Sequence, residues 1–446
     1  MNYLWKSSSR DKSIFLANML DHFDTAIYSL LAPFLAPIFF PEQDTVIQLL
    51  LAYSVLASAV VTRPLGALFF GLFAQNRGIQ RGLCFSLYGL GLCCLLISLL
   101  PTYVHWGWAS GALLFVLRGG IGFFAAGEGS LAPVLILLDK PPEENYETTY
   151  WYQTSSMIGT VSASVVCTAI LCVQDTYPDA WRLCFLGGSA VSLAAYRLRN
   201  TPEILLNTPL IQKRARATII TAFHQLWEHR FSAFSITLLS GFSYITYAFP
   251  FIFLNGFVPL ITSITLKELL EMNSLLLMLD MLLIPVVGRV LKPFFNKRTS
   301  QPYGAHRNIM LLSLSLLVLF VPLMMGQLDF SSTLAKVTFL RIGVILLGVI
   351  FLTPKMSYTI HLFEKKEAAP LVIGLASSLG SSLIGRTLPA VCMALWIYKP
   401  HPLVPATYVV FWALMGILVI ILEIRNREQY PIFKNRSLHN SNPEII

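Results

Sequence analysis

Twelve long apolar segments take up almost the whole chain. A helix of about 20 apolar residues crosses a bilayer, and lipid leaves no water to satisfy open backbone groups. Only 12% of the residues are charged, about half the share of a soluble domain. The sequence therefore predicts an all-α polytopic membrane protein with transmembrane helices near residues 14–40, 47–73, 82–104, 108–138, 150–173, 181–199, 233–256, 264–288, 307–326, 333–356, 367–398 and 403–424.

Lysine and arginine gather in alternate loops, which is the pattern that keeps basic loops in the cytoplasm. The basic side includes Lys6, Arg10, Lys12, Arg77, Arg81, Lys292, Lys297, Arg298 and Arg307. The net charge of +9 thus reflects topology and gives no support to nucleic-acid binding. The first apolar segment is too long for a signal-peptide core, so we expect it to stay uncleaved. Both termini are expected in the cytoplasm of a cell with a bacterial-type inner membrane.

The two halves of the chain resemble each other. The matched positions lie at a nearly constant offset of about half the chain, which indicates a duplicated six-helix unit: 20–28 with 239–247, 71–81 with 288–298, and Arg118 with Arg341. Carriers built from such repeats hold their substrate between the halves. We expect two pseudo-symmetric bundles, with the domains arranged as a cytoplasmic N-terminus (1–13), a first bundle (14–199), a cytoplasmic linker (200–230), a second bundle (231–424) and a cytoplasmic tail (425–446).

Two acids lie inside the first span, where an ionisable group costs a few kcal/mol. Asp21 and Asp24 are three residues apart, so they share one face of a helix. Two carboxylates this close resist ionising together. We interpret them as candidates for proton coupling; the alternative is that they line a wet groove or cap a kinked helix.

Arginines and aromatic residues supply the candidates for substrate binding or ion pairing. Arg63, Arg118 and Arg386 lie within apolar segments, and a guanidinium can hold a carboxylate with two parallel hydrogen bonds. For Arg63, a structural ion pair with Asp21 or Asp24 is an equal alternative. Aromatic rings can also bind a compact organic cation, and we single out Tyr28 and Tyr244 for that role.

The other ionisable residues inside the spans are assigned one further proton-coupling candidate and several structural roles. Glu128 lies ten residues beyond Arg118, about 15 Å along the helix and within about 80° around its axis, so it is a third candidate for proton coupling. Asp280 is expected to pair with Arg341 or Arg386. Lys355 and His361 are explained by snorkelling at the end of a span.

No other chemistry is supported by the sequence. The seven cysteines lie mostly in apolar runs without metal-ligand spacing, and packing is their expected role. Phosphate-binding loops and hydrolase or metalloprotease motifs are missing, so we expect neither an enzyme nor a bound cofactor or metal.

These residues resemble the metabolite:proton symporters of the major facilitator superfamily, which include the proline/betaine transporters. The family's span 1 pattern is similar to Asp21–Thr25 followed by Tyr28, and its other motifs are similar to Arg63–Gly71, Arg118–Glu128, Trp181–Gly187 and Thr201–Glu203. The resemblance is good over residues 14–203 and faint afterwards. It implies the two-bundle fold and import of a small organic solute with protons by alternating access.

The loop after span 2 departs from the family pattern. The family carries D-R-x-G-R-R there, whereas residues 75–81 read QNRGIQR and lack the acid. We assign Gly71, Gly78 and Arg81 to this gating loop, and expect its altered charge to change the conformational balance. The tail beyond Arg425 has no heptads, so the coiled coil of some osmosensing relatives is not expected.

The sequence thus predicts a monomeric proton-coupled symporter whose partners are protons, the lipid bilayer and a carboxylate-bearing solute such as proline, betaine or an organic acid. The arginines do not separate these solutes. An uncoupled facilitator or exchanger of the same fold, and a non-transporting membrane sensor, remain alternatives.

Overall fold

The computed structural model describes residues 9–41, 45–137, 140, 142–173, 176–199, 217–295, 304–362 and 368–429, which form helices and turns and no strand. The first half contains α2 (Ser9–Phe39), α3 (Thr45–Arg77), α4 (Ile79–Ser98), α5 (Tyr103–Trp106), α6 (Trp108–Leu137), α7 (Pro142–Val173) and α8 (Trp181–Arg199). The second half contains α10 (Ile219–Glu228), α11 (Arg230–Ala248), η1 (Phe249–Phe253), α12 (Leu254–Ile261), α13 (Leu266–Phe295), α14 (Gly304–Met325), α15 (Leu334–His361), α16 (Ala369–Gly380), η2 (Ser381–Gly385), α17 (Leu388–Tyr398) and α18 (Leu403–Gln429).

Each predicted segment corresponds to one long helix or to one helix interrupted by a π-turn. Within the described ranges, nine helical stretches are long and apolar enough to cross a membrane, while α2, α7 and α8 are long but carry more polar residues. One segment boundary was wrong, and one helix was not predicted. The third segment ends at Ser98 instead of residue 104, because Pro101 follows and the chain turns into α5. The linker, expected to be a polar connection, contains α10; residues 200–216 and the chain beyond 429 lie outside the described part.

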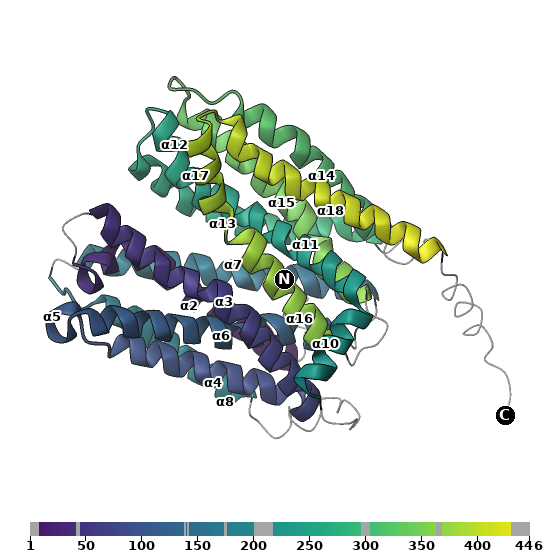
Figure 1. Cartoon of the computed structure of the whole chain (residues 1–446), viewed down its shortest axis with the longest axis horizontal. Coiled ribbons are helices and arrows are strands. Elements are labelled where there is room, and N and C mark those ends of the chain that lie inside the picture. Colours follow the sequence, from purple (N-terminus) through teal and green to yellow (C-terminus); the bar gives the residue numbers. More distant parts are fainter. Residues whose placement is uncertain are drawn as a thin grey trace.

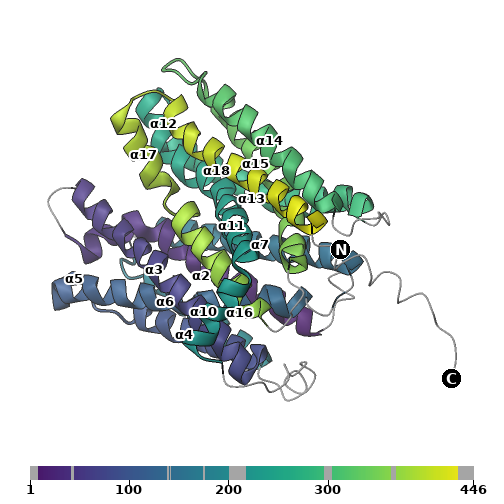
Figure 2. The ribbon, with the colours of Figure 1, turned by 45° about the vertical axis from the view of Figure 1, so that its right-hand side comes forward.

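Helices α2 to α8 form one bundle and helices α11 to α18 form a second one beside it (Figure 1). Figure 2 shows the same pair of bundles from another side, with α10 at the end where they meet. At the other end the bundles diverge, and an open pocket separates α7 from α13. It is lined by Val161, Ser164, Thr168, Ser274, Leu277 and Met278.

At the end near α10, which we call the closed end, small residues bring the two bundles into contact. A Cβ on Gly71 of α3 would lie 2.8 Å from Leu371 Cα of α16, and a Cβ on Gly374 would lie 2.3 Å from Ser130 Cβ of α6. Between α7 and α13, Lys292 Nζ lies 2.5 Å from Glu147 Oε2. Close helix approach at such residues is the usual way that helices associate in membranes.

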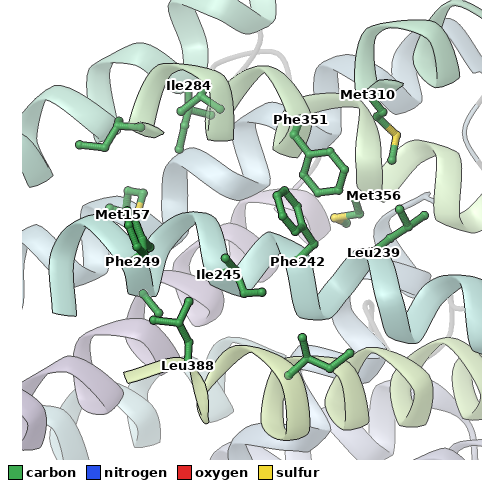
Figure 3. Packing of buried hydrophobic residues seen from close by; sticks show 14 of the residues in the cluster. Met157, Leu239, Phe242, Ile245, Phe249, Ile284, Met310, Phe351, Met356 and Leu388 are labelled. Atoms are coloured by element: carbon green, nitrogen blue, oxygen red, sulfur yellow. The ribbon is translucent and has the colours of Figure 1, made fainter. Parts of the chain in front are cut away.

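The second bundle is held by a continuous apolar core, part of which Figure 3 shows. Phe242 of α11 packs edge-on against Phe351 of α15, with ring centroids 5.3 Å apart. Both side chains are completely buried. The same apolar cluster extends into the first bundle through residues of α3, α6 and α7. At the closed end, one continuous core therefore joins the two bundles.

Candidate functional site

Two buried carboxyls stand on α2 inside the first bundle. Asp21 and Asp24 are 4% and 2% exposed. Ser192 Oγ of α8 donates a hydrogen bond to Asp24 Oδ2 at 3.2 Å. Gly188, one turn before Ser192, makes room for this carboxyl, because a Cβ there would lie 2.0 Å from Asp24 Oδ1. Oδ1 of each aspartate has no hydrogen-bond partner in the described structure.

The guanidinium of Arg118 lies over an aromatic ring of the same bundle. Its Cζ is 4.6 Å from the centroid of Tyr28, which α2 carries one turn beyond Asp24. Arg118 is 6% exposed, and its Nε and Nη1 have no hydrogen-bond partner among the described residues. Cation–π contact partly compensates for the loss of water, but the two nitrogens remain available to an anion.

Arg386 repeats this arrangement in the second bundle. Its Cζ lies 4.7 Å from the ring centroid of Tyr244 on α11, and its Nη1 donates to Tyr244 Oη at 3.2 Å. The close packing depends on Gly385, where a Cβ would lie 2.4 Å from Tyr244 Cβ. Arg386 follows the π-turn η2, and its backbone N–H bonds to Ser381 O. Such π-turns inside helices are frequent at functional sites.

Arg63 completes a group of three cations, to which we refer as the arginine cluster (Arg63, Arg118 and Arg386). Its Nη2 donates to Thr25 Oγ1 of α2 at 3.3 Å. The charge of Arg63 acts on both other arginines, and Arg63 and Arg386 both act on Asp21. The arginine cluster therefore contains residues of both bundles, and Asp21 lies within electrostatic range of two of its arginines.

No salt bridge joins the arginine cluster to a carboxylate within the described part of the chain. Salt bridges there are Lys140–Asp11, Arg182–Asp179 and Lys292–Glu147, all outside the site. The ion pair of Arg63 with Asp21 or Asp24, which was the alternative to a role in substrate binding, is thus not formed. Three guanidinium groups within electrostatic range of one another, with two acids near them, leave a surplus of positive charge that a bound anion would offset.

Glu128 lies away from this group. It is ten residues further along α6 than Arg118, about 15 Å by helix rise, and 2% exposed. Two residues beyond it, Ser130 contacts Gly374 of the other bundle. The structure therefore divides the three acids predicted for proton coupling: Asp21 and Asp24 lie at the arginine cluster, and Glu128 lies toward the closed end.

The predicted ion pair of Asp280 is wrong for both arginines. Arg341 is completely buried, and it donates to Asn273 Oδ1 and to the Leu269 carbonyl of α13. Arg386 bonds to Tyr244 instead. Neutral oxygen atoms thus accept hydrogen bonds from Nη atoms of both guanidinium groups, while the Nε of each has no partner among the described residues. A hydropathy pattern does not reveal such partners.

Several polar residues at the site were missed by the sequence reasoning. Asn18 of α2 is 2% exposed and donates from Nδ2 to Ser155 Oγ and Ser156 Oγ of α7, at 2.8 and 2.7 Å. Ser192 and Gly188 position Asp24 from α8. The only signals available were a lone amide one turn before Asp21 and a glycine–serine pair spaced by four residues.

The gating loop connects to α10 through amides. Gln75 Nε2 donates to Gln225 Oε1 at 2.8 Å, and Asn76 Nδ2 donates to the Ala217 carbonyl at 2.9 Å. Gly78 has φ of 93°, a left-handed conformation that suits glycine, and Arg81 is exposed. Gln75, at the position of the missing acid, thus bonds to α10, and Asn76 bonds to Ala217, which precedes that helix.

Two helical bundles around a buried, charged site define a carrier of the membrane-transport class. The chain belongs to the Major Facilitator Superfamily, whose family model matches residues 14–386. It is thus a multi-pass membrane transporter and not an enzyme.

The curated relatives with similar sequences include transporters named for organic acids and a transporter named for proline and betaine. A citrate-proton symporter of Salmonella typhi is 23% identical over 94% of this chain and 95% of its own length. A proline/betaine transporter of Escherichia coli K12 is 26% identical over 44% of this chain, and the match spans only 40% of that transporter. An alpha-ketoglutarate permease of the same organism is 29% identical over 41% of this chain and 43% of its own length.

Solved structures share the fold at low identity. A proton:xylose symporter has a TM-score of 0.68 at 13% identity and covers 94% of this chain and 95% of its own. A bacterial homologue of the iron transporter ferroportin has a TM-score of 0.67 at 12% identity and covers 92% of this chain and 98% of its own.

Proposed function

We propose that the protein is a proton-coupled symporter of a small organic anion with more than one carboxylate, and that it works by alternating access. The observation that carries the proposal is the arginine cluster, three cations from both bundles without a salt bridge to the nearby acids in the described structure. A guanidinium holds a carboxylate with paired hydrogen bonds, so a di- or tricarboxylate could engage both bundles at once.

The aromatic residues argue against a betaine-like solute. Binding a quaternary ammonium group requires open ring faces. Tyr28 is completely buried with Arg118 over its ring, and Tyr244 has Arg386 over its ring. The citrate and alpha-ketoglutarate relatives are consistent with an organic acid as the solute.

Asp24 and Asp21 are the proposed proton carriers. Asp24 accepts a hydrogen bond from the neutral Ser192 and makes no salt bridge in the described structure, so a proton is the available means of neutralising its charge. Asp21 lies among Arg63 and Arg386. Arrival of an anion at those arginines would weaken their hold on Asp21, which links solute binding to protonation. Glu128 is proposed as a later proton site toward the closed end.

We further propose that residues 14–199 and 231–424 move as two domains and that both termini are cytoplasmic. The closed end would then face the cytoplasm, because the basic residues Arg77, Arg81 and Lys292 lie there, near the ends of α3, α4 and α13. The pocket between α7 and α13 would open to the outside. A monomer is sufficient for this mechanism, since both halves of the site come from one chain.

Uptake into proteoliposomes with an alkaline interior tests the proposal. Labelled citrate, 2-oxoglutarate, proline and betaine are supplied in turn, with a protonophore as the control. We expect the organic acids to accumulate above equilibrium and the protonophore to abolish this. Preference for betaine would contradict the anion assignment, equilibration without accumulation would indicate an uncoupled facilitator, and binding without flux would indicate a sensor.

A further inference from the structure

Helix α10 divides into three sectors around its axis. At about 100° per residue, Ile219, Ile220, Phe223 and Trp227 fall within about 100° of one another. These four side chains are 60%, 81%, 65% and 71% exposed, which is unusual for such large apolar groups on one short helix. We call them the apolar sector.

The second sector of α10 faces the protein. Ala222 is 1% exposed, and Leu226 packs against the buried cluster formed by Ala67 of α3, Ala126 of α6 and Leu375 of α16. Gln225 accepts the hydrogen bond from Gln75. The helix is thus fixed against both bundles at the closed end, and its rotation about its own axis is determined.

The third sector is exposed and polar, and comprises Thr221, His224 and Glu228. Going once around the helix, the order is protein, apolar sector, polar sector and protein again. A helix that lies in a membrane surface needs this order, because its apolar side must face the acyl chains while the adjoining side faces water. A helix in bulk water would gain nothing from the apolar sector.

The surroundings of α10 also match a membrane surface. His229 alone separates α10 from α11, which begins one of the membrane-spanning stretches, so the apolar sector lies next to lipid-exposed surface. Arg230 lies over the ring of Trp227 at 5.1 Å and donates to the Trp227 carbonyl at 3.3 Å. Tryptophan is typical of the membrane interface, and basic residues there attract anionic headgroups.

We propose that α10 is an interfacial helix whose apolar sector inserts into the bilayer surface, with anionic headgroups held by Arg230 and by Arg77 and Arg81 at the same end. Gln225 and Leu226 fix α10 against both bundles. Insertion of α10 would therefore attach the closed end to the membrane surface. The proposal does not depend on which solute is carried.

Spin labels on the full-length protein in nanodiscs test this placement. Ile220→Cys and Phe223→Cys place labels in the apolar sector, and Thr221→Cys and His224→Cys place matched labels in the polar sector of the same helix. All four positions are exposed. Thr221→Cys also removes the hydrogen bond from the Thr218 N–H to Thr221 Oγ1, so His224→Cys is the polar-sector label that leaves the N-terminus of the helix unchanged. The described free cysteines, Cys84, Cys93, Cys94, Cys167, Cys184 and Cys392, are buried, and the unsubstituted protein provides the labelling background.

Collision with oxygen, which dissolves in lipid, is compared with collision with a water-soluble nickel complex. We expect labels at 220 and 223 to collide mainly with oxygen, at a depth of about 5–10 Å, and those at 221 and 224 to collide mainly with nickel. Phosphatidylglycerol should deepen the first pair relative to phosphatidylcholine alone. Equal nickel collision at all four positions would overturn the proposal. Protection of 220 and 223 from both reagents would also overturn it, since a second copy or another protein would then cover the sector.

Discussion

Arg118 and Arg386 each lie over a tyrosine that the first helix of their own bundle carries. Tyr28 comes from α2 and Tyr244 from α11. These contacts hold the guanidinium planes in place before a solute arrives, so less conformational entropy is lost on binding. The internal repeat does not account for this similarity, because it aligns Arg118 with Arg341, which instead bonds to Asn273 and to the Leu269 carbonyl.

Arg118→Lys keeps the positive charge but removes the planar fork, so we expect it to weaken solute binding. The loss of charge-assisted hydrogen bonds predicts an increase in Kd of about 10- to 100-fold. Arg182→Lys is the matched control, since Arg182 also lies over an aromatic ring, that of Trp181 at 4.6 Å, but outside the site. Isothermal titration calorimetry on both variants checks this, and an equal change in Kd would contradict the assigned role of Arg118.

Gly188→Ala should disturb Asp24 by steric conflict alone. The added Cβ would lie 2.0 Å from Asp24 Oδ1, so the carboxyl or α8 must shift. We expect at least tenfold slower proton-driven uptake, whereas exchange of solute across the membrane is affected less. Gly187→Ala, one residue earlier, is the control because nothing lies within 4 Å of its added Cβ. If the two variants transport equally well, Asp24 does not need its present position.

At the scale of elements, the bundles meet where small residues face each other. Gly374 of α16 packs on Ser130 of α6, and Gly71 of α3 packs on Leu371. Small residues let the two bundles approach each other closely at this end. Alternating access requires this contact to open.

Gly374→Ala should shift the protein toward conformations that are open at the closed end. Its Cβ would lie 2.3 Å from Ser130 Cβ, and overpacking of this kind costs about 1–3 kcal/mol. Distances between spin labels on α6 and α16 measure the shift, and they should lengthen. Gly129→Ala, whose added Cβ meets nothing within 4 Å, should leave the distances unchanged. Unchanged distances in Gly374→Ala would show that the contact is not needed for closure.

For the whole molecule, the helices were predictable and the contacts between them were not. Lipid fixes the length and polarity of a span, so hydropathy was enough to place the twelve segments. Contacts such as that of Tyr244 with Arg386 join residues 142 positions apart, and nothing local in the sequence encodes them. Asp280 was assigned to the wrong partners because Arg341 uses neutral ones. Helix α10 was missed because its apolar residues lie in an otherwise polar connection.

The ion pair of Glu147 with Lys292 links α7 to α13 and should favour closure. Both side chains are partly exposed, so the pair contributes about 0.2–1 kcal/mol. Glu147→Gln is therefore expected to raise the population open at this end by up to about fivefold, measured by cysteine accessibility at the closed end. The charge exchange Glu147→Lys with Lys292→Glu should restore closure. Failure of the exchange to restore it would contradict a role for the ion pair itself.

Proton movement on addition of solute tests the central claim most directly. Proteoliposomes are suspended in a weakly buffered medium, an organic acid such as citrate is added, and the external pH is recorded. Symport predicts that the medium becomes more alkaline as protons enter with the solute, and that Asp21→Asn and Asp24→Asn remove this signal while the arginine cluster still binds the solute. Solute entry into wild-type vesicles without any change in pH would contradict the account.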